Sequence, residues 1–286
     1  MKSIRILSAF FLSLAITTLH AAPKPKPLRA LLITGGCCHD YATQKDLLKA
    51  GIEARAHVIV DQDHTNNKST NPPLAIYGNS DYAKGYDIVI HDECAAAMKD
   101  VETVEGVLAP HRKGIPGVNL HCAMHSYRVG NHREPTEAGT EASIWFDYLG
   151  LQSSGHGPKA PVEIKFTKKK HPITKTLKDW TTMDEELYNN IQVFPSTTSL
   201  AEGTQMQKPR QRKPKKGKKA AATAAPPTKP KKATASVVWV NEYHGARVFS
   251  TTIGHFNETV GDDRYLDLVT RGLLWSCKKL NKDYLK

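Results

Sequence analysis

Four apolar segments, each the length of one buried β-strand, constrain the fold of this chain more than any other feature. They are LRALLIT (28–34), HVIVDQD (57–63), YDIVIHDE (86–93) and GIPGVNLH (114–121). Stretches with helical character, such as TQKDLLKAGIEA and MKDVETVEGVLAPHRK, lie between them. Strands that alternate with helices form parallel sheets connected by right-handed crossovers. The first half of the chain therefore predicts an α/β fold, with a mostly parallel sheet and helices on both faces.

The second half of the chain has a different pattern. VEIKFT (162–167) alternates between apolar and polar residues, which is typical of a half-exposed strand. IQVFPSTTSLAEG and VVWVNEYHGARVFSTTIGH indicate antiparallel strands, and DDRYLDLVTRGLLWSCKKL (262–280) has the periodicity of a closing helix. We therefore expect a single α/β domain over residues 28–280 whose sheet carries an antiparallel extension.

The net charge of +12 is concentrated in one tract. Residues 208–232 hold 11 Lys and Arg and no acid, and outside this tract and the first five residues 27 basic residues face 28 acidic ones. The folded part is thus nearly neutral, and no nucleic-acid partner is expected. The composition of the basic tract predicts a disordered Lys/Pro/Ala-rich insertion over residues 204–235. A second interpretation is that residues 208–232 contact an anionic surface of the cell envelope.

The N-terminus has the pattern of a signal peptide. The basic MKSIR precedes the apolar ILSAFFLSLAITTL, and a cleavage near Ala21 would remove residues 1–21. The apolar stretch is too short to span a membrane, and no later run reaches that length. The first cysteine, Cys37, is far from the cleavage site, so a lipoprotein is not expected. The sequence predicts an exported, periplasmic or secreted protein without a membrane span.

The chain has five cysteines, and they form no recognisable framework. Cys37 and Cys38 are adjacent, whereas Cys94, Cys122 and Cys277 are scattered, and there is no CxxC pair. Export permits a disulfide, but the spacing does not assign one. Cys122 directly follows a buried strand, where either a nucleophile or a small buried thiol would fit.

Ligands of open parallel sheets bind beyond the carboxyl ends of the strands. Gly36 and His39 follow the first strand, Asp92 lies at the end of the third, and Tyr127 follows the fourth, so these four residues are candidates for substrate binding. Gly36 alternatively belongs to a tight turn that needs positive φ, and His39 to a helix cap.

Histidines at several strand ends suggest a metal site. His121, His156 and His255 are the candidate ligands, because neutral imidazoles with one carboxylate suit zinc or manganese. The alternative is that each is a hydrogen-bonded structural residue. Glu186 and His125 are the candidates for catalytic proton transfer. Glu186 lies in TMDEELYNN (182–190), which alternatively reads as an acidic helix N-terminus.

Five blocks in order resemble a ThuA-like (trehalose-utilisation-type) domain from about residue 28 to 278. They are ALLITGGCCHDY, GVNLHCAMHSYR, WFDYLGLQSSGHGP, HPITKTLKDW…DEELYN and VVWVNEYHGARVFSTTIGHFNETV…YLDLVTRGLLW. The resemblance implies a flavodoxin-like fold related to class I glutamine amidotransferases, and a role in disaccharide or glycoside catabolism that often passes through 3-keto sugars. His121, His156, Glu186 and His255 match the family pattern, whereas the amidotransferase nucleophile is generally absent from it.

Two functions follow from these residues. The first is a carbohydrate-processing enzyme that performs a metal-assisted hydrolysis, elimination or isomerisation. The second is a non-catalytic carbohydrate-binding or scaffold module of the cell envelope, in which Trp145, Tyr127 or Trp239 would stack on the sugar. A thiol hydrolase that uses Cys122 is a third hypothesis.

Overall fold

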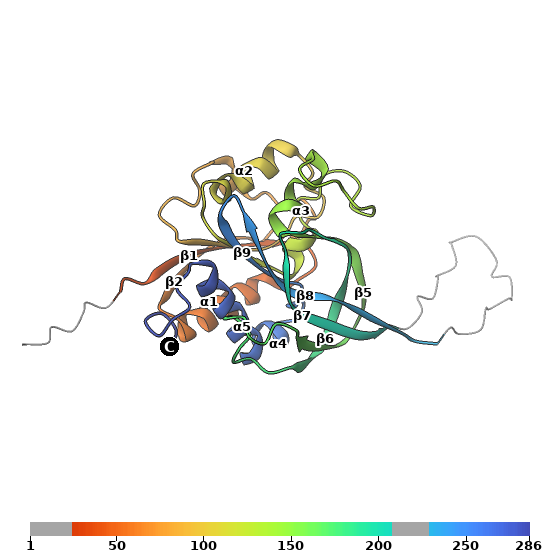
Figure 1. Ribbon diagram of the computed structural model, residues 1–286. Helices are drawn as coiled ribbons and strands as arrows, with labels where there is room; N and C mark the ends of the chain where they lie inside the picture. The colour runs from red at the N-terminus through yellow and green to blue at the C-terminus, as the bar shows by residue number, and fades with distance from the viewer. Residues whose placement is uncertain (1–24, 208–228) are drawn as a thin grey trace, which may run out of the picture.

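One continuous sheet of nine strands joins the two halves of the chain in the computed structural model (Figure 1). The structure describes residues 25–207 and 229–286, so the expected signal peptide lies outside it. The strand order is β2-β1-β3-β4-β9-β8-β7-β5-β6. The strands are β1 (Leu28–Gly36), β2 (Val58–Thr65), β3 (Ile88–Cys94), β4 (Gly117–Leu120), β5 (Leu151–Phe166), β6 (Trp180–Val193), β7 (Thr198–Gln207), β8 (Lys231–Tyr243) and β9 (Ala246–Thr251).

The expected α/β architecture is confirmed in the first half. The five strands from β2 to β9 in this order are parallel to their neighbours, and β1 is buried at every position except Arg29. Helices α2 (Val101–Arg112) and α3 (Ile144–Leu149) cover one face of this part of the sheet. Helices α1 (Tyr41–Arg55) and α5 (Asp263–Ser276) pack on the other face (Figure 1). Two apolar cores therefore sandwich the sheet, because parallel strands are buried on both sides.

The antiparallel extension is also confirmed. Strands β8, β7, β5 and β6 follow β9, each antiparallel to its neighbour. TMDEELYNN lies inside β6, so the alternative of a helix N-terminus for residues 182–190 is wrong. Asp184, Glu185 and Glu186 instead pair with β5, and register shifts along this pair show that the ladder is irregular there. Strand pairing overrode the local preference of acidic residues for a helix start.

The boundaries of the expected insertion need correction. Strands β7 and β8 stay paired from Thr204 opposite Thr234 to Gln207 opposite Lys231, so the ends of the range 204–235 are strand. Residues 208–228 lie outside the described part of the chain. No helix in the described residues is long and apolar enough to cross a membrane.

A chain of buried polar side chains lies beneath α2 and α3. The Glu93 carboxylate accepts hydrogen bonds from the hydroxyls of Tyr77 and Tyr127, each at 2.7 Å. His91 Nδ1 lies 2.9 Å from the same carboxylate, and His91 Nε2 lies 3.0 Å from His111 Nε2. All five side chains are buried, so each depends on the others for its hydrogen bonds.

We expect His111 to make stability depend on pH. Burial and the neighbouring His91 lower the pKa of His111 from 6.5 to about 3. Between these values the unfolded chain binds a proton that the folded protein excludes, so stability is lost as the pH falls through this window, by up to about 1.4 kcal/mol per pH unit. Urea unfolding of wild type and His111→Gln between pH 4 and 7 measures this effect. The variant should have the shallower dependence, and parallel curves would contradict the assignment.

Candidate functional site

Three histidine side chains from three separate strand ends meet at the carboxyl edge of the parallel strands. His39 follows β1, His121 begins the short 3-10 turn η2 (His121–His125) after β4, and His255 follows β9. One ring nitrogen from each lies within 4.8 Å of the others. The ring of His39 is 4.8 Å from that of His121 and 4.6 Å from that of His255, between centroids. The edge predicted from the sequence therefore gathers three histidine side chains.

Unusual backbone conformations bring these rings together. Gly36 has φ of +96°, and a Cβ at this position would lie 2.2 Å from the carbonyl oxygen of Cys94. This close approach makes glycine necessary and agrees with the alternative of a tight turn. Cys38 and His121 also have positive φ, at +82° and +39°, which non-glycine residues rarely adopt. The turns after β1 and β4 are thus strained where they present His39 and His121.

Backbone carbonyls orient two of the three imidazoles. His121 Nδ1 lies 2.6 Å from the carbonyl oxygen of Thr252, and His39 Nδ1 lies 3.2 Å from that of His255. Because a carbonyl only accepts, both Nδ1 atoms donate. The Nε2 atom of His121 then faces Nδ1 of His255 at 3.3 Å and the Glu186 carboxylate at 3.6 Å. Metal-binding histidines use this arrangement, in which the second ring nitrogen is held by a carbonyl or carboxylate.

Glu186 reaches the histidines from the antiparallel extension. Its carboxylate lies 3.6 Å from His121 Nε2, 3.6 Å from His255 Nδ1 and 3.4 Å from His156 Nδ1. Burial would raise the pKa of Glu186, but the hydrogen bond with His121 and the nearby histidines hold it at about 2. The adjacent Glu185 accepts from the backbone N–H of His255 at 2.9 Å and so fixes the third imidazole.

The protonation of His39 and His255 suits metal binding. Burial, with the nearby charge of His121, lowers the pKa of His39 to about 3 and that of His255 to about 4. Burial alone would lower the pKa of His121 as well, but Glu186 and Glu185 raise it above its usual value. His39 and His255 are therefore neutral near pH 7, the form in which imidazole binds a metal. Three imidazoles with a carboxylate beside them fit a divalent transition metal.

The histidine group differs from the expected ligand set in one member. His39, which was expected to bind substrate, is the residue that joins His121 and His255 in the group. His156, expected as a ligand, contacts Glu186, and its side chain is 42% exposed. His156 thus lies at the solvent side of the group.

Three other predicted residues are not members of the histidine group. His125 Nε2 is 2.9 Å from Ser153 Oγ, and its ring stacks on Tyr188 at 4.0 Å. Asp92 is buried within β3, and its Oδ2 has no hydrogen-bond partner among the described residues. The hydroxyl of Tyr127 is bound to Glu93 on the side of α2 and α3. Asp92 and Tyr127 therefore do not belong to the histidine group. His125 borders it, because Tyr188 packs against both His125 and His121 and the ring of His125 lies 6.3 Å from that of His156.

The aromatic and thiol hypotheses meet physical obstacles. Trp145, Tyr127 and Trp239 are at most 1% exposed, so none of them presents a face to a sugar in solution. Cys122 is buried, and its hydrogen bond with Cys94 together with burial raises its pKa well above the usual value. A thiol in this state is a poor nucleophile.

Sequence reasoning missed Tyr188. It lies two residues after Glu186 on β6, and its ring is 5.1 Å from that of His121. Residues two apart on a strand share a face, so reading residues 182–190 as a strand would have placed Tyr188 beside Glu186.

A cavity of about 530 Å³ opens beside the histidines. Its lining contains side chains of both charges, two imidazoles and one phenyl ring. The residues are Cys38, His39, Asp40, Lys68, Lys159, His255, Phe256, Asn257 and Glu258. A second hollow of about 460 Å³ shares Phe256 and Glu258 with it and is otherwise lined by Pro161, Met183 and Asp184. His39 and His255 therefore face a space of the size that small-molecule ligands occupy.

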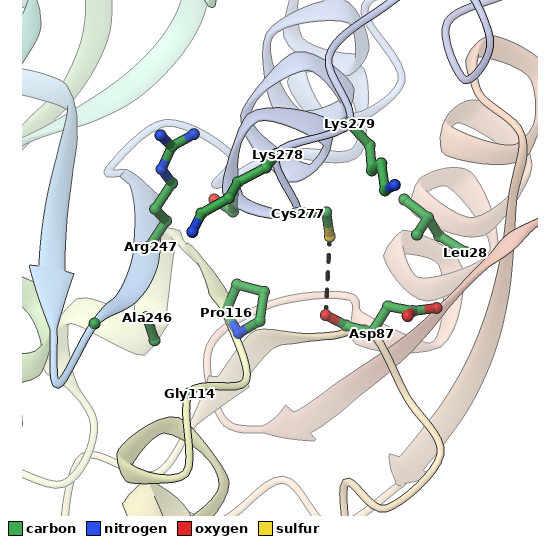
Figure 2. Close-up of a pocket in the computed structure, with 11 residues that line it drawn as sticks. Leu28, Asp87, Gly114, Pro116, Ala246, Arg247, Cys277, Lys278 and Lys279 are labelled. Carbon is green, nitrogen blue, oxygen red and sulfur yellow. Dashed lines mark hydrogen bonds between the residues drawn. The ribbon is translucent and has the colours of Figure 1, made fainter.

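A further pocket lies at the opposite edge of the sheet (Figure 2). Its volume is about 220 Å³, and Leu28, Asp87 and Pro116, which start or precede parallel strands, line it. Cys277 Sγ points there at the carbonyl oxygen of Asp87, 3.8 Å away. None of the histidines borders this pocket, so it is separate from the candidate site.

The ThuA family, described as trehalose utilisation, matches residues 29–276. The chain belongs to the ThuA family. Two solved ThuA-like proteins share the fold across their length. The one from Parabacteroides merdae is 18% identical, with a TM-score of 0.56, over 88% of this chain and 90% of that one. The one from Bacteroides uniformis is 14% identical, with a TM-score of 0.54, over 91% of this chain and 95% of that one.

A more distant structural match is the glutaminase domain of Trypanosoma brucei CTPS with bound acivicin. It is 10% identical, with a TM-score of 0.43, over 91% of this ThuA chain and 100% of that one. No protein of curated function matches the chain in sequence.

We expect His39, His121 and His255 to bind one metal ion together. Each single change to Ala should weaken zinc binding by at least about 100-fold, since losing only a residue that orients a ligand already costs about 10–100-fold. Calorimetric titration of the metal-free protein with zinc and with manganese measures this. His156→Ala should retain binding better than the other three variants.

His244→Asn is the matched control. His244 is exposed in the β8–β9 turn with φ of +49°, a conformation that Asn tolerates. Its metal affinity should equal that of wild type. Undiminished binding in all of the His39, His121 and His255 variants would exclude this centre.

Proposed function

We propose that this ThuA protein is a metal-dependent enzyme that acts on a disaccharide or another glycoside, including its 3-keto form. The observation that carries the proposal is the group of His39, His121 and His255, with Glu186 in contact, beside a cavity of about 530 Å³. Family membership supports a role in sugar metabolism. The reaction would be a hydrolysis, an elimination or an isomerisation.

The charge state of the site supports a division of roles. A zinc or manganese ion bound there would polarise a sugar carbonyl or acidify a water molecule. Glu186, ionised above its pKa of about 2, can accept a hydrogen bond or, as a weak base, a proton, and it has no proton to donate at neutral pH. Thr252 and Glu185 hold His121 and His255 in place through backbone contacts.

The cavity lining suits a sugar in two respects. Lys68, Lys159, Asp40, Asn257 and Glu258 offer donors and acceptors for hydroxyl groups. Phe256 supplies an apolar face, with Lys159 Nζ 5.0 Å from its ring centroid. A sugar ring has polar edges and apolar faces, so the two kinds of side chain complement it.

We also propose that the protein is exported, to the periplasm or beyond. The pattern of residues 1–21 supports export, and so does the disulfide between Cys37 and Cys38, because disulfides persist in oxidising compartments. The basic residues 208–232 would then meet the anionic envelope surface. Fractionation of cells that express the full chain, with N-terminal sequencing of the mature protein, tests this proposal.

One observation favours the second candidate, a non-catalytic carbohydrate-binding module. A pKa of about 2 is far below neutral pH, where a general base is most efficient, so Glu186 alone is a weak base. In such a module the carboxylate would only bind sugar hydroxyls. The two functions differ in their dependence on metal.

Turnover by the zinc- or manganese-loaded protein decides between them. Trehalose, other disaccharides and their 3-keto forms are incubated with the full protein, and products are followed by mass spectrometry. For the enzyme, Glu186→Gln should lower kcat by about 10²–10⁴-fold, the usual contribution of a group that transfers protons. Glu202→Gln, which changes an exposed carboxylate on β7, is the matched control and should keep full activity. Sugar binding without turnover, unaffected by a chelator, would identify a module.

A further inference from the structure

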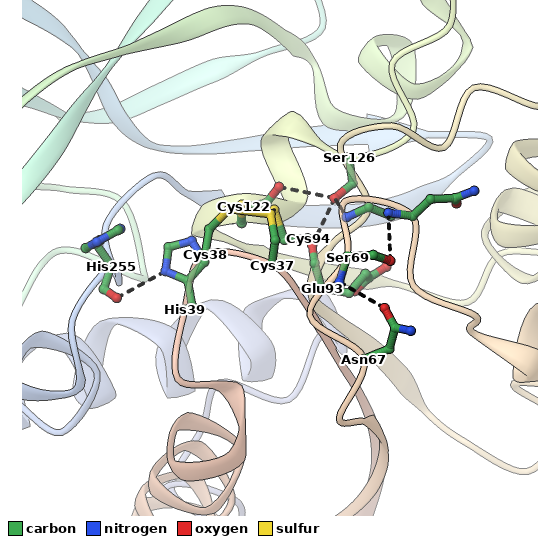
Figure 3. The surroundings of a disulfide bond; sticks show 12 residues. Cys37, Cys38, His39, Asn67, Ser69, Glu93, Cys94, Cys122, Ser126 and His255 are labelled. Carbon is green, nitrogen blue, oxygen red and sulfur yellow. Dashed lines mark hydrogen bonds between the residues drawn. A yellow bond between two sulfur atoms is a disulfide. The ribbon is translucent and has the colours of Figure 1, made fainter.

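Four cysteines form a second cluster next to the histidine group. Cys37 and Cys38 are joined by a disulfide in the turn after β1. Cys94, the last residue of β3, places its Sγ 3.5 Å from Cys37 Sγ (Figure 3). Cys122, which follows β4, is buried in the same cluster as Cys37 and Cys94. Three strand ends thus bring a disulfide and two thiols together, and the proposed sugar chemistry uses none of them.

The sulfur atoms differ in their access to solvent. Cys94 is 2% exposed, whereas Cys38 is exposed. A reagent in solution therefore reaches Cys38 but not Cys94. The group that the Cys94 thiol does meet is Cys37, at a separation typical of atoms poised to react.

We propose that Cys94 exchanges with the Cys37–Cys38 disulfide inside the folded protein. Cys94 loses its proton, and its Sγ forms a bond with Cys37 Sγ while the bond between Cys37 and Cys38 breaks. Cys38 leaves as a thiolate and takes up one proton. The products are a Cys37–Cys94 disulfide and a Cys38 thiol, so atoms and electrons balance without an oxidant or reductant.

Cys37, Cys94 and Cys122 are buried in one cluster, so the contact between Cys94 and Cys37 excludes water. The outcome is the transfer of a free thiol from the buried β3 to the exposed turn before His39. There a disulfide or an electrophile from solvent can modify Cys38, so the cluster is a modification site for thiol-reactive compounds.

Alkylation of the native protein without reductant tests the proposal. The full chain carries Cys277→Ser, which removes a thiol at the opposite edge of the sheet. It is incubated with iodoacetamide, quenched in acid, and mapped by mass spectrometry of peptides. The label should accumulate on Cys38, together with a peptide pair joined by Cys37 and Cys94.

The Cys94→Ser variant removes the attacking group and leaves the shape of the side chain. Labelling of Cys38 should fall at least about tenfold, because a serine hydroxyl does not exchange with a disulfide. Cys94→Ala repeats the test, and circular dichroism checks that both variants fold. Equal labelling of Cys38 with and without Cys94 would overturn the proposal.

The peptide map of the protein that carries only Cys277→Ser tests the proposal even if both Cys94 variants fail to fold. An intact Cys37–Cys38 disulfide with Cys38 unlabelled after prolonged incubation would overturn the proposal. So would four free thiols in the protein prepared without reductant.

Discussion

The contact between Glu186 and His121 joins the two halves of the sheet at the candidate site. Glu186 belongs to the antiparallel extension, His121 ends the parallel part, and the two side chains approach to 3.6 Å while both are buried. A buried carboxylate without a partner is strongly destabilising, so β6 must lie where His121 and His255 can face it. The extension is therefore part of the site, since without it the histidines would lack a carboxylate.

Backbone strain is concentrated around the same point. Gly36, Cys38 and His121 all have positive φ. Gly36 is the last residue of β1, and the other two lie in the turns that follow β1 and β4. Such conformations are retained where the surrounding structure holds them, and they cluster at functional sites. Here both turns directly follow strands of the parallel core, and the disulfide between Cys37 and Cys38 links two residues of the first turn. The histidine group and the cysteine cluster thus share one strained segment of chain.

Much of the fold followed from local patterns. Apolar runs with helices between them predicted the parallel core, and alternation predicted the antiparallel strands. Residues 182–190 were ambiguous, because acids before an apolar pair fit a helix start as well as a strand. Pairing with β5 decided for the strand, and it put Tyr188 on the same face as Glu186. Local propensity could not predict the strand or the position of Tyr188, since the pairing joins residues far apart in the sequence.

For the candidate site, too, the sequence determined one part and the tertiary structure another. The sequence by itself placed His121 and the turn with His39 at one edge, because the carboxyl ends of parallel strands meet there. It also singled out Glu186, from the acids of residues 182–190 and from the resemblance to the ThuA family. The segment that ends in His255 was expected to be antiparallel, and only the assembled sheet made β9 parallel to β4. Only the tertiary structure decided that His39, rather than His156, completes the group, and that Cys94 faces Cys37. Both outcomes depend on left-handed turns and on contacts across neighbouring strands, whose geometry arises only when the sheet is assembled.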